Sequence, residues 1–168
     1  MASPRGRRGA RGKLVVETLI RAPIERCFDL ARSVDAHVAT QEERAETAVA
    51  GRLTGLMELG ETVTWRARHL GVTQHLTSTI VSLDRPRAFR DSMVKGAFAR
   101  FDHDHFFEAR EGGTLMRDVF DFASPFGPIG WIVDRLFLGR YMRRFLVARA
   151  EVLRALAESE AWRKFVPG

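Results

Sequence analysis

Hydrophobic and polar residues alternate most regularly between Arg100 and Ser124, in the segment RFDHDHFFEAREGGTLMRDVFDFAS. Successive side chains of a strand point to opposite faces, so every second residue shares a face. Glu111-Gly112-Gly113 supplies a turn, which predicts a β-hairpin. With Glu111 and Gly112 as the loop, Arg110 pairs with Gly113, and the facing pairs are Phe107 with Met116, His105 with Asp118, His103 with Phe120 and Phe101 with Phe122. A register shifted by one residue would separate these pairs.

The preceding residues predict further strands and two short helices. Residues 14–20 are aliphatic and β-branched and end at a turn, which indicates a first strand. Pro23 begins a helix that runs to Ala31, and Ser33 or Asp35 caps a second short helix. More strands are predicted at 43–50, 61–69, 72–83 and 87–95, with an irregular connection at 51–60 suited to a lid or entrance. Together the strands form an antiparallel meander with strong bends.

Beyond Ser124 the apolar residues recur at steps of three and four, which is typical of a helix. Pro128 stands where a helix should begin, and after Gly130 the only further breaker before Pro167 is Gly139. The apolar stripe of this long terminal helix comprises Leu138, Tyr141, Met142, Phe145, Ala148, Val152, Ala155 and Leu156. A stripe of this length needs a large apolar partner, and the concave face of the sheet is the only one of sufficient size.

Composition and charge divide the chain into one folded domain and two tails. A chain of 168 residues with 45% hydrophobic residues fits a single domain. The first thirteen residues hold five basic and no acidic side chains, so they carry most of the net charge of +6. We therefore expect a disordered basic tail at 1–13, a folded domain at 14–159 and a C-terminal tail at 160–168. The nearly neutral domain argues against specific nucleic-acid binding.

Several classes of protein are disfavoured by what the sequence contains. Cys27 is the only cysteine, so no intrachain disulfide forms, and we expect it to be a small buried residue of the first helix. The run LVVETLI is too short for a transmembrane segment or a secretory signal, which predicts a cytoplasmic protein. A Gly-rich phosphate loop, a nucleophile elbow, a cysteine cluster and a His-Glu zinc motif are all missing, so no cofactor is predicted.

The predicted order of elements resembles the helix-grip fold of the START and SRPBCC superfamily, which includes polyketide cyclase-like and lipid-transfer domains. The resemblance spans Lys13 to Ser159 and is nearest to a bacterial SRPBCC ligand-binding subgroup. It is carried by APIERCFDLARSVDAH, LGETVTWRARHLGV, SLDRPRAFRD, HDHFFEAREGGTLMRDVFDFASPFGPIG and the terminal helix. It implies an α+β fold in which a curved antiparallel sheet of about six to seven strands wraps around the long C-terminal helix, with a deep apolar cavity between them.

This resemblance leads to a first hypothesis, the binding of a small hydrophobic or amphipathic ligand in that cavity. The expected lining residues are Trp65, Phe101, His103, His105, Phe107, Met116, Asp118, Phe120, Phe122, Tyr141 and Phe145. A second hypothesis is an enzyme of the cyclase or dehydratase kind, because the same fold hosts both carriers and enzymes.

His103, His105 and Asp118 are the candidate catalytic residues of the second hypothesis. His105 and Asp118 would form an acid-base pair, or a polar pair that merely satisfies a buried carboxylate. Two histidines and a carboxylate also form a set that transition metals use. Because the helix-grip fold is not usually associated with a metal, no metal is predicted.

Two further groups of residues permit other interpretations. Trp65, His69 and His75 would face one another only in one register, and Trp65 is interpreted as cavity wall. The basic tail supports a third hypothesis, an interaction protein that engages an anionic partner. The arginines of the last helix are interpreted as a solvated face, and they are Arg135, Arg140, Arg143, Arg144 and Arg149.

Overall fold

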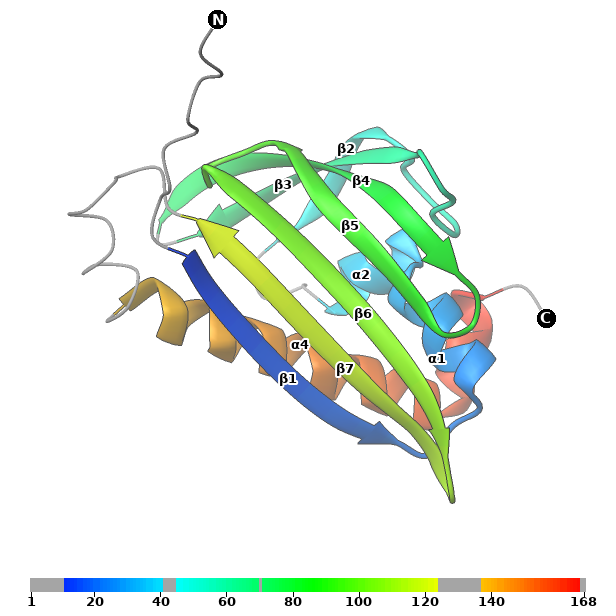
Figure 1. Cartoon of the computed structure of the whole chain (residues 1–168). Coiled ribbons are helices and arrows are strands. Elements are labelled where there is room, and N and C mark those ends of the chain that lie inside the picture. Colours follow the sequence, from blue (N-terminus) through cyan, green and yellow to red (C-terminus); the bar gives the residue numbers. More distant parts are fainter. Residues whose placement is uncertain (1–10, 41–44, 70, 124–136, 167–168) are drawn as a thin grey trace, which may run out of the picture.

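A seven-stranded antiparallel sheet curves around one long helix in the computed structural model of the chain (Figure 1). The structure describes residues 11–40, 45–69, 71–123 and 137–166. The strands lie in the order β1-β7-β6-β5-β4-β3-β2. Their bounds are β1 Arg11–Ile20, β2 Thr47–Gly51, β3 Thr62–His69, β4 Val72–Asp84, β5 Ala88–Lys95, β6 Arg100–Arg110 and β7 Gly113–Ala123. The helices are α1 Ile24–Ala31, α2 Val34–Thr40, α4 Gly139–Glu158 and the 3-10 helix η3 Glu160–Lys164.

This architecture is the predicted α+β helix-grip fold, with two short helices after the first strand and a long C-terminal helix. The hairpin register is confirmed at every predicted pair, from Arg110 with Gly113 to Phe101 with Phe122. A Cβ atom on Gly113 would lie 2.1 Å from the carbonyl oxygen of Ile20, so the turn passes close to β1 and requires glycine. The regular alternation and this turn together fix the register that sets the inward face.

The sheet bends where its register shifts. Irregularities interrupt the pairing between Thr77 and Ser78 and between Ile80 and Ser82 in β4, and another lies between Ala48 and Ala50 in β2. An extra residue on one strand increases the local twist and bends the strand. The curvature leaves a concave inner face, which α1, α2 and α4 cover (Figure 1).

Helix α1 fills one end of the concave face. Phe28 is fully buried, and its ring lies edge-on at 5.5 Å from the rings of both Phe89 and Phe107. On the same helix, Asp29 accepts hydrogen bonds from Arg32 and from Arg85 of the β4–β5 turn. Burial opposes the charged carboxylate of Asp29, but these two guanidinium groups outweigh burial and lower its pKa. The ion pairs therefore tie α1 to the sheet.

The inner face of α4 differs from the predicted stripe. Its buried residues are Met142, Leu146, Ala150, Leu153 and Ala157. Ala148, Val152 and Ala155 of the predicted stripe are exposed, so their assignment was wrong, whereas Tyr141 and Phe145 are half-buried beside the buried row. The two rows differ by one or two positions, and both recur at steps of three and four, so spacing alone did not separate them. The predicted start at Pro128 lies outside the described residues, as does Arg135.

Both predicted tail boundaries needed correction. Strand β1 begins at Arg11, and its first residues pair with Asp121 to Ala123 of β7. Backbone pairing requires no particular side chain, and Gly12 lies directly against the ring of Phe122, where a Cβ atom would be 2.5 Å from Cζ. At the other end, η3 packs onto the domain and Val166 is buried. Residues 1–10 lie outside the described part of the chain.

Two remaining observations bear on the class of protein. Cys27 is buried on α1, as predicted, and burial raises the pKa of its thiol to about 11, which suits a packing role. Among the described residues, no helix is both long and apolar enough to span a membrane.

Candidate functional site

A cavity of about 370 Å³ lies between the inner face of β3–β6 and the first half of α4. Its sheet wall includes Val63 and Trp65 of β3, Ile80 of β4 and Phe89 of β5, and its helix wall includes Met142 and Leu146. Met57 also lines it, so the connection between β2 and β3 forms part of the cavity wall. The sequence had suggested a lid or entrance for this connection. Arg32 holds this connection, because its guanidinium donates to the carbonyl oxygen of Met57 at 3.0 Å. Most of the surface is apolar, as in pockets that bind organic ligands.

Seven of the eleven residues expected to line the cavity do so, and they are Trp65, Phe101, His103, His105, Phe120, Tyr141 and Phe145. The other four, Phe107, Met116, Asp118 and Phe122, point to the inner face but are covered. Phe107 and its strand partner Met116 lie at the end of the hairpin that α1 fills. The ring of Phe122 is covered by Phe98, whose ring centroid is 5.9 Å away, and by Gly12.

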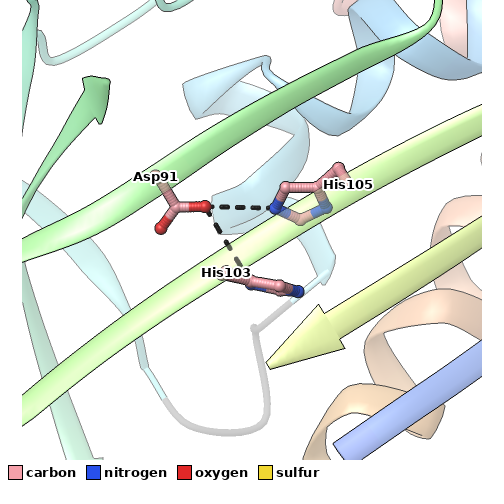
Figure 2. Close-up of side chains that lie close together, drawn as sticks. All are labelled: Asp91, His103 and His105. Carbon is pink, nitrogen blue, oxygen red and sulfur yellow. Dashed lines mark hydrogen bonds and ion pairs between the residues drawn. The ribbon is translucent and has the colours of Figure 1, made fainter. Parts of the chain in front are cut away.

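A polar cluster interrupts the apolar wall where β5, β6 and β7 lie side by side. Figure 2 shows Asp91, His103 and His105, whose side chains point toward one another. His105 Nε2 lies 3.1 Å from Asp91 Oδ1, within hydrogen-bond distance, and His103 Nδ1 lies 4.0 Å from the same oxygen. Their strands fix this arrangement, because Asp91 pairs with His103 and Phe89 pairs with His105. The ring of Phe89 stacks on His105 at 4.2 Å between centroids.

Asp118 of β7 completes the cluster from the other side of the two rings. Its Oδ1 atom lies 2.6 Å from His105 Nδ1 and 3.3 Å from His103 Nε2. The predicted contact between His105 and Asp118 is therefore present, as a close ion pair. Neither contact has the angles of a hydrogen bond, so within the described residues Asp118 Oδ1 and His103 Nε2 lack a hydrogen-bond partner. Each imidazole thus stands between two carboxylates, with Asp91 on the cavity side.

Two opposing effects determine the ionisation of the cluster. Burial disfavours the charged form of every group, whereas an oppositely charged neighbour favours it. Burial disfavours the charged form of His105, but the Asp118 and Asp91 carboxylates outweigh it and raise the pKa of His105. For His103, burial and the neighbouring His105 prevail and lower the pKa. Burial also disfavours both carboxylates, yet the imidazoles lower the pKa of Asp118 and of Asp91. Asp118 and Asp91 are therefore ionised at neutral pH.

A second polar position lies on the α2 side of the same cavity. His37 Nε2 is 3.1 Å from Glu46 Oε1, and the His37 ring stacks on Trp65 at 4.1 Å. Trp65 is therefore cavity wall, as interpreted from the sequence. The register that would bring Trp65 and His75 face to face is not the one observed, because Trp65 pairs with Leu76 and points inward, whereas His75 pairs with Arg66 and its side chain is exposed. The side chain of His69 lies outside the described part of the structure.

Sequence reasoning missed Asp91 and Arg149. Asp91 lies between Phe89 and Met93 at every second position of β5, a signal that would have placed it on the inner face. Arg149 was grouped with solvated arginines, yet it lines the cavity and donates to the carbonyl oxygen of Ala31 at 3.4 Å. Its charge contributes to the lowered pKa of Asp91. Of the arginines grouped with it, Arg140, Arg143 and Arg144 are exposed.

The fold and the cavity define a class of architecture, the helix-grip fold, in which a curved antiparallel sheet wraps around a long C-terminal helix. Similar solved structures include TTHA0849 from Thermus thermophilus, with a TM-score of 0.70, 16% identity, and coverage of 86% of this chain and 95% of that chain. The Zhui aromatase/cyclase from a Streptomyces species has a TM-score of 0.71 at 12% identity, covering 88% and 94%. The major latex-like protein 151 from Panax ginseng has a TM-score of 0.66 at 15% identity, covering 89% and 99%. At these identities the likeness shows a shared fold alone.

No family model and no curated protein sequence matches the chain. The assignment to the helix-grip class therefore rests on the three-dimensional comparison and on the order of elements.

Proposed function

We propose that the protein binds a small amphipathic molecule in the cavity between the sheet and α4. The observation that carries this proposal is the cavity of about 370 Å³, which is within the size range of ligand pockets and has mainly apolar walls. Burying the apolar body of a ligand there contributes about 25 cal/mol for each Å² removed from water.

The polar positions in the wall give the ligand its orientation. Asp91 and His103 line the cavity from β5 and β6, and the pair of His37 and Glu46 lines it on the α2 side. A buried polar group is costly unless it finds a partner, so a ligand hydroxyl, carbonyl or amine facing these positions would be favoured over a pure hydrocarbon. The ligand we expect therefore has an apolar body and at least one hydrogen-bonding group.

We expect the purified protein to bind one molecule of the hydrophobic fluorophore anilinonaphthalenesulfonate per folded chain, with saturation and a raised melting temperature. Ligand binding to the native state alone raises stability by RT ln(1 + [L]/Kd). Native mass spectrometry and solvent extraction would reveal any molecule that co-purifies. Repeatedly empty preparations, together with no thermal shift across a panel of hydrophobic and amphipathic compounds, would contradict the proposal.

A second candidate function, a cyclase-like or dehydratase-like reaction on the bound molecule, is favoured by the ionisable cluster in the wall. His105, Asp91 and Asp118 are close enough to form hydrogen bonds or ion pairs with one another, as acid-base groups must be. One of the proteins with a similar fold is an aromatase/cyclase. Recovery of a bound polyketide-like probe in chemically altered form would favour the enzyme, and recovery unchanged would favour the carrier.

A further inference from the structure

We infer that Asp91, His103 and His105 bind one divalent transition-metal ion at the polar wall of the cavity. One ligand atom from each of the three residues lies within 4.8 Å of the other two (Figure 2). The strands impose this grouping, because Asp91 faces His103 directly and His105 follows on the same face of β6. This inference replaces the sequence-based prediction of no metal, which considered Asp118 and not Asp91 as the third residue.

The distances suit a metal centre with little rearrangement. Ligand atoms that each stand about 2.0–2.2 Å from one ion are roughly 3–3.5 Å apart. The 3.1 Å separation of His105 Nε2 and Asp91 Oδ1 already has this value, and the 4.0 Å separation of His103 Nδ1 and Asp91 Oδ1 is slightly larger. Asp91 is the least buried of the three, with 21% of its side chain exposed, so it has room to rotate. The remaining coordination positions would face the cavity.

Asp118 supplies the outer partner that metal-binding histidines usually have. The nitrogen of each ring that points away from Asp91 points to Asp118 Oδ1, at 2.6 Å for His105 and 3.3 Å for His103. With a small rotation of each ring, Asp118 Oδ1 would accept the imidazole N–H and so direct the lone pair of the other nitrogen to the metal. This arrangement explains why a carboxylate lies deep in an apolar wall with an oxygen that lacks a hydrogen-bond partner among the described residues.

The set of ligands and its charge define the class of ion. Two imidazoles and one carboxylate suit zinc, iron(II), cobalt(II) or nickel(II), whereas magnesium and calcium prefer oxygen ligands alone. An imidazole that binds a metal is neutral, so in the loaded site the cluster contributes the two negative charges of Asp91 and Asp118, which a divalent ion neutralises. The guanidinium of Arg149, a positive charge in the same cavity, is held toward the end of α1 by the carbonyl oxygen of Ala31. The inference does not depend on the proposed organic ligand.

The test uses the full chain without a polyhistidine tag, stripped by a chelator and then titrated with zinc(II) or cobalt(II) alone. We expect one ion per chain by calorimetry, and visible absorption bands of nitrogen- and oxygen-coordinated cobalt(II). Asp91→Ala and His105→Gln should each lose stoichiometric binding. Asp118→Asn should weaken it by about 10–100-fold, because it removes only the outer partner.

His75 is an exposed residue of β4 that does not belong to the cluster, so it provides the matched control, and His75→Ala should bind the metal like the wild type. Circular dichroism of each variant establishes that it is folded. If Asp91→Ala does not fold, Asp91→Asn replaces it. Absence of stoichiometric binding by the wild type would overturn the inference, as would binding that survives both ligand substitutions or disappears in His75→Ala. None of these outcomes changes the expected binding of anilinonaphthalenesulfonate in the metal-free protein.

Discussion

Replacing Val63 with Trp should abolish the binding of anilinonaphthalenesulfonate, with a loss of affinity of at least about 100-fold. Val63 is 2% exposed and lines the cavity from β3. An indole ring at this position would occupy the space that the ligand needs. Overpacking a filled core costs about 1–3 kcal/mol, but here the added atoms enter an existing cavity, so we expect the variant to fold. Fluorescence titration of the folded variant measures the effect.

Val81→Trp is the matched control for this substitution. Val81 of β4 is 47% exposed, so the same added volume projects outward and should leave the affinity unchanged. Wild-type affinity in a folded Val63→Trp variant would place the bound probe outside the cavity. An equal loss of affinity in both variants would show that the added indole does not act by filling the cavity.

Phe28→Ala should lower the free energy of unfolding by about 3–5 kcal/mol. The ring is fully buried, and it packs against Phe89 and Phe107 and beneath the guanidinium of Arg32. Its removal would leave a cavity between α1 and the sheet, in addition to the lost apolar burial. Urea denaturation at constant pH measures the change.

Phe106→Ala is the comparison for Phe28→Ala, because Phe106 lies on the outer face of β6 and is 36% exposed. It should cost less than about 1 kcal/mol, since surface substitutions rarely cost more. Similar losses for the two variants would contradict the view that α1 is anchored by Phe28.

The hairpin was predictable to the residue because two independent signals agree there. Alternation assigns the faces of β6 and β7, and the turn at Gly112-Gly113 fixes the register that pairs His105 with Asp118. On α4 only spacing was available, and two overlapping rows satisfied it, so the buried row was misassigned. The first residues of β1 carry no hydrophobic signal, because backbone pairing with β7 places them.

The candidate site was predictable only in part. Which inward-facing residues line the cavity, and which strands bring them together, depends on how the helices and strands pack. Phe101 and Phe107 occupy equivalent inward positions of one strand, yet one lines the cavity and the other is covered by Phe28. Asp91 belongs to a strand whose faces the sequence left unassigned. Its proximity to His103 follows from the pairing of β5 with β6, which no local pattern specifies.

The central claim, that a ligand occupies the space between the sheet and α4, is tested most directly by a methyl-resolved NMR titration with anilinonaphthalenesulfonate. We predict saturable shifts at one equivalent for methyl groups that line the cavity, those of Met57, Val63, Ile80 and Leu146. Exposed methyl groups on the surface, those of Leu59, Val72 and Val94, should not move. Shifts confined to the exposed methyl groups, or none at all up to several equivalents, would contradict the claim.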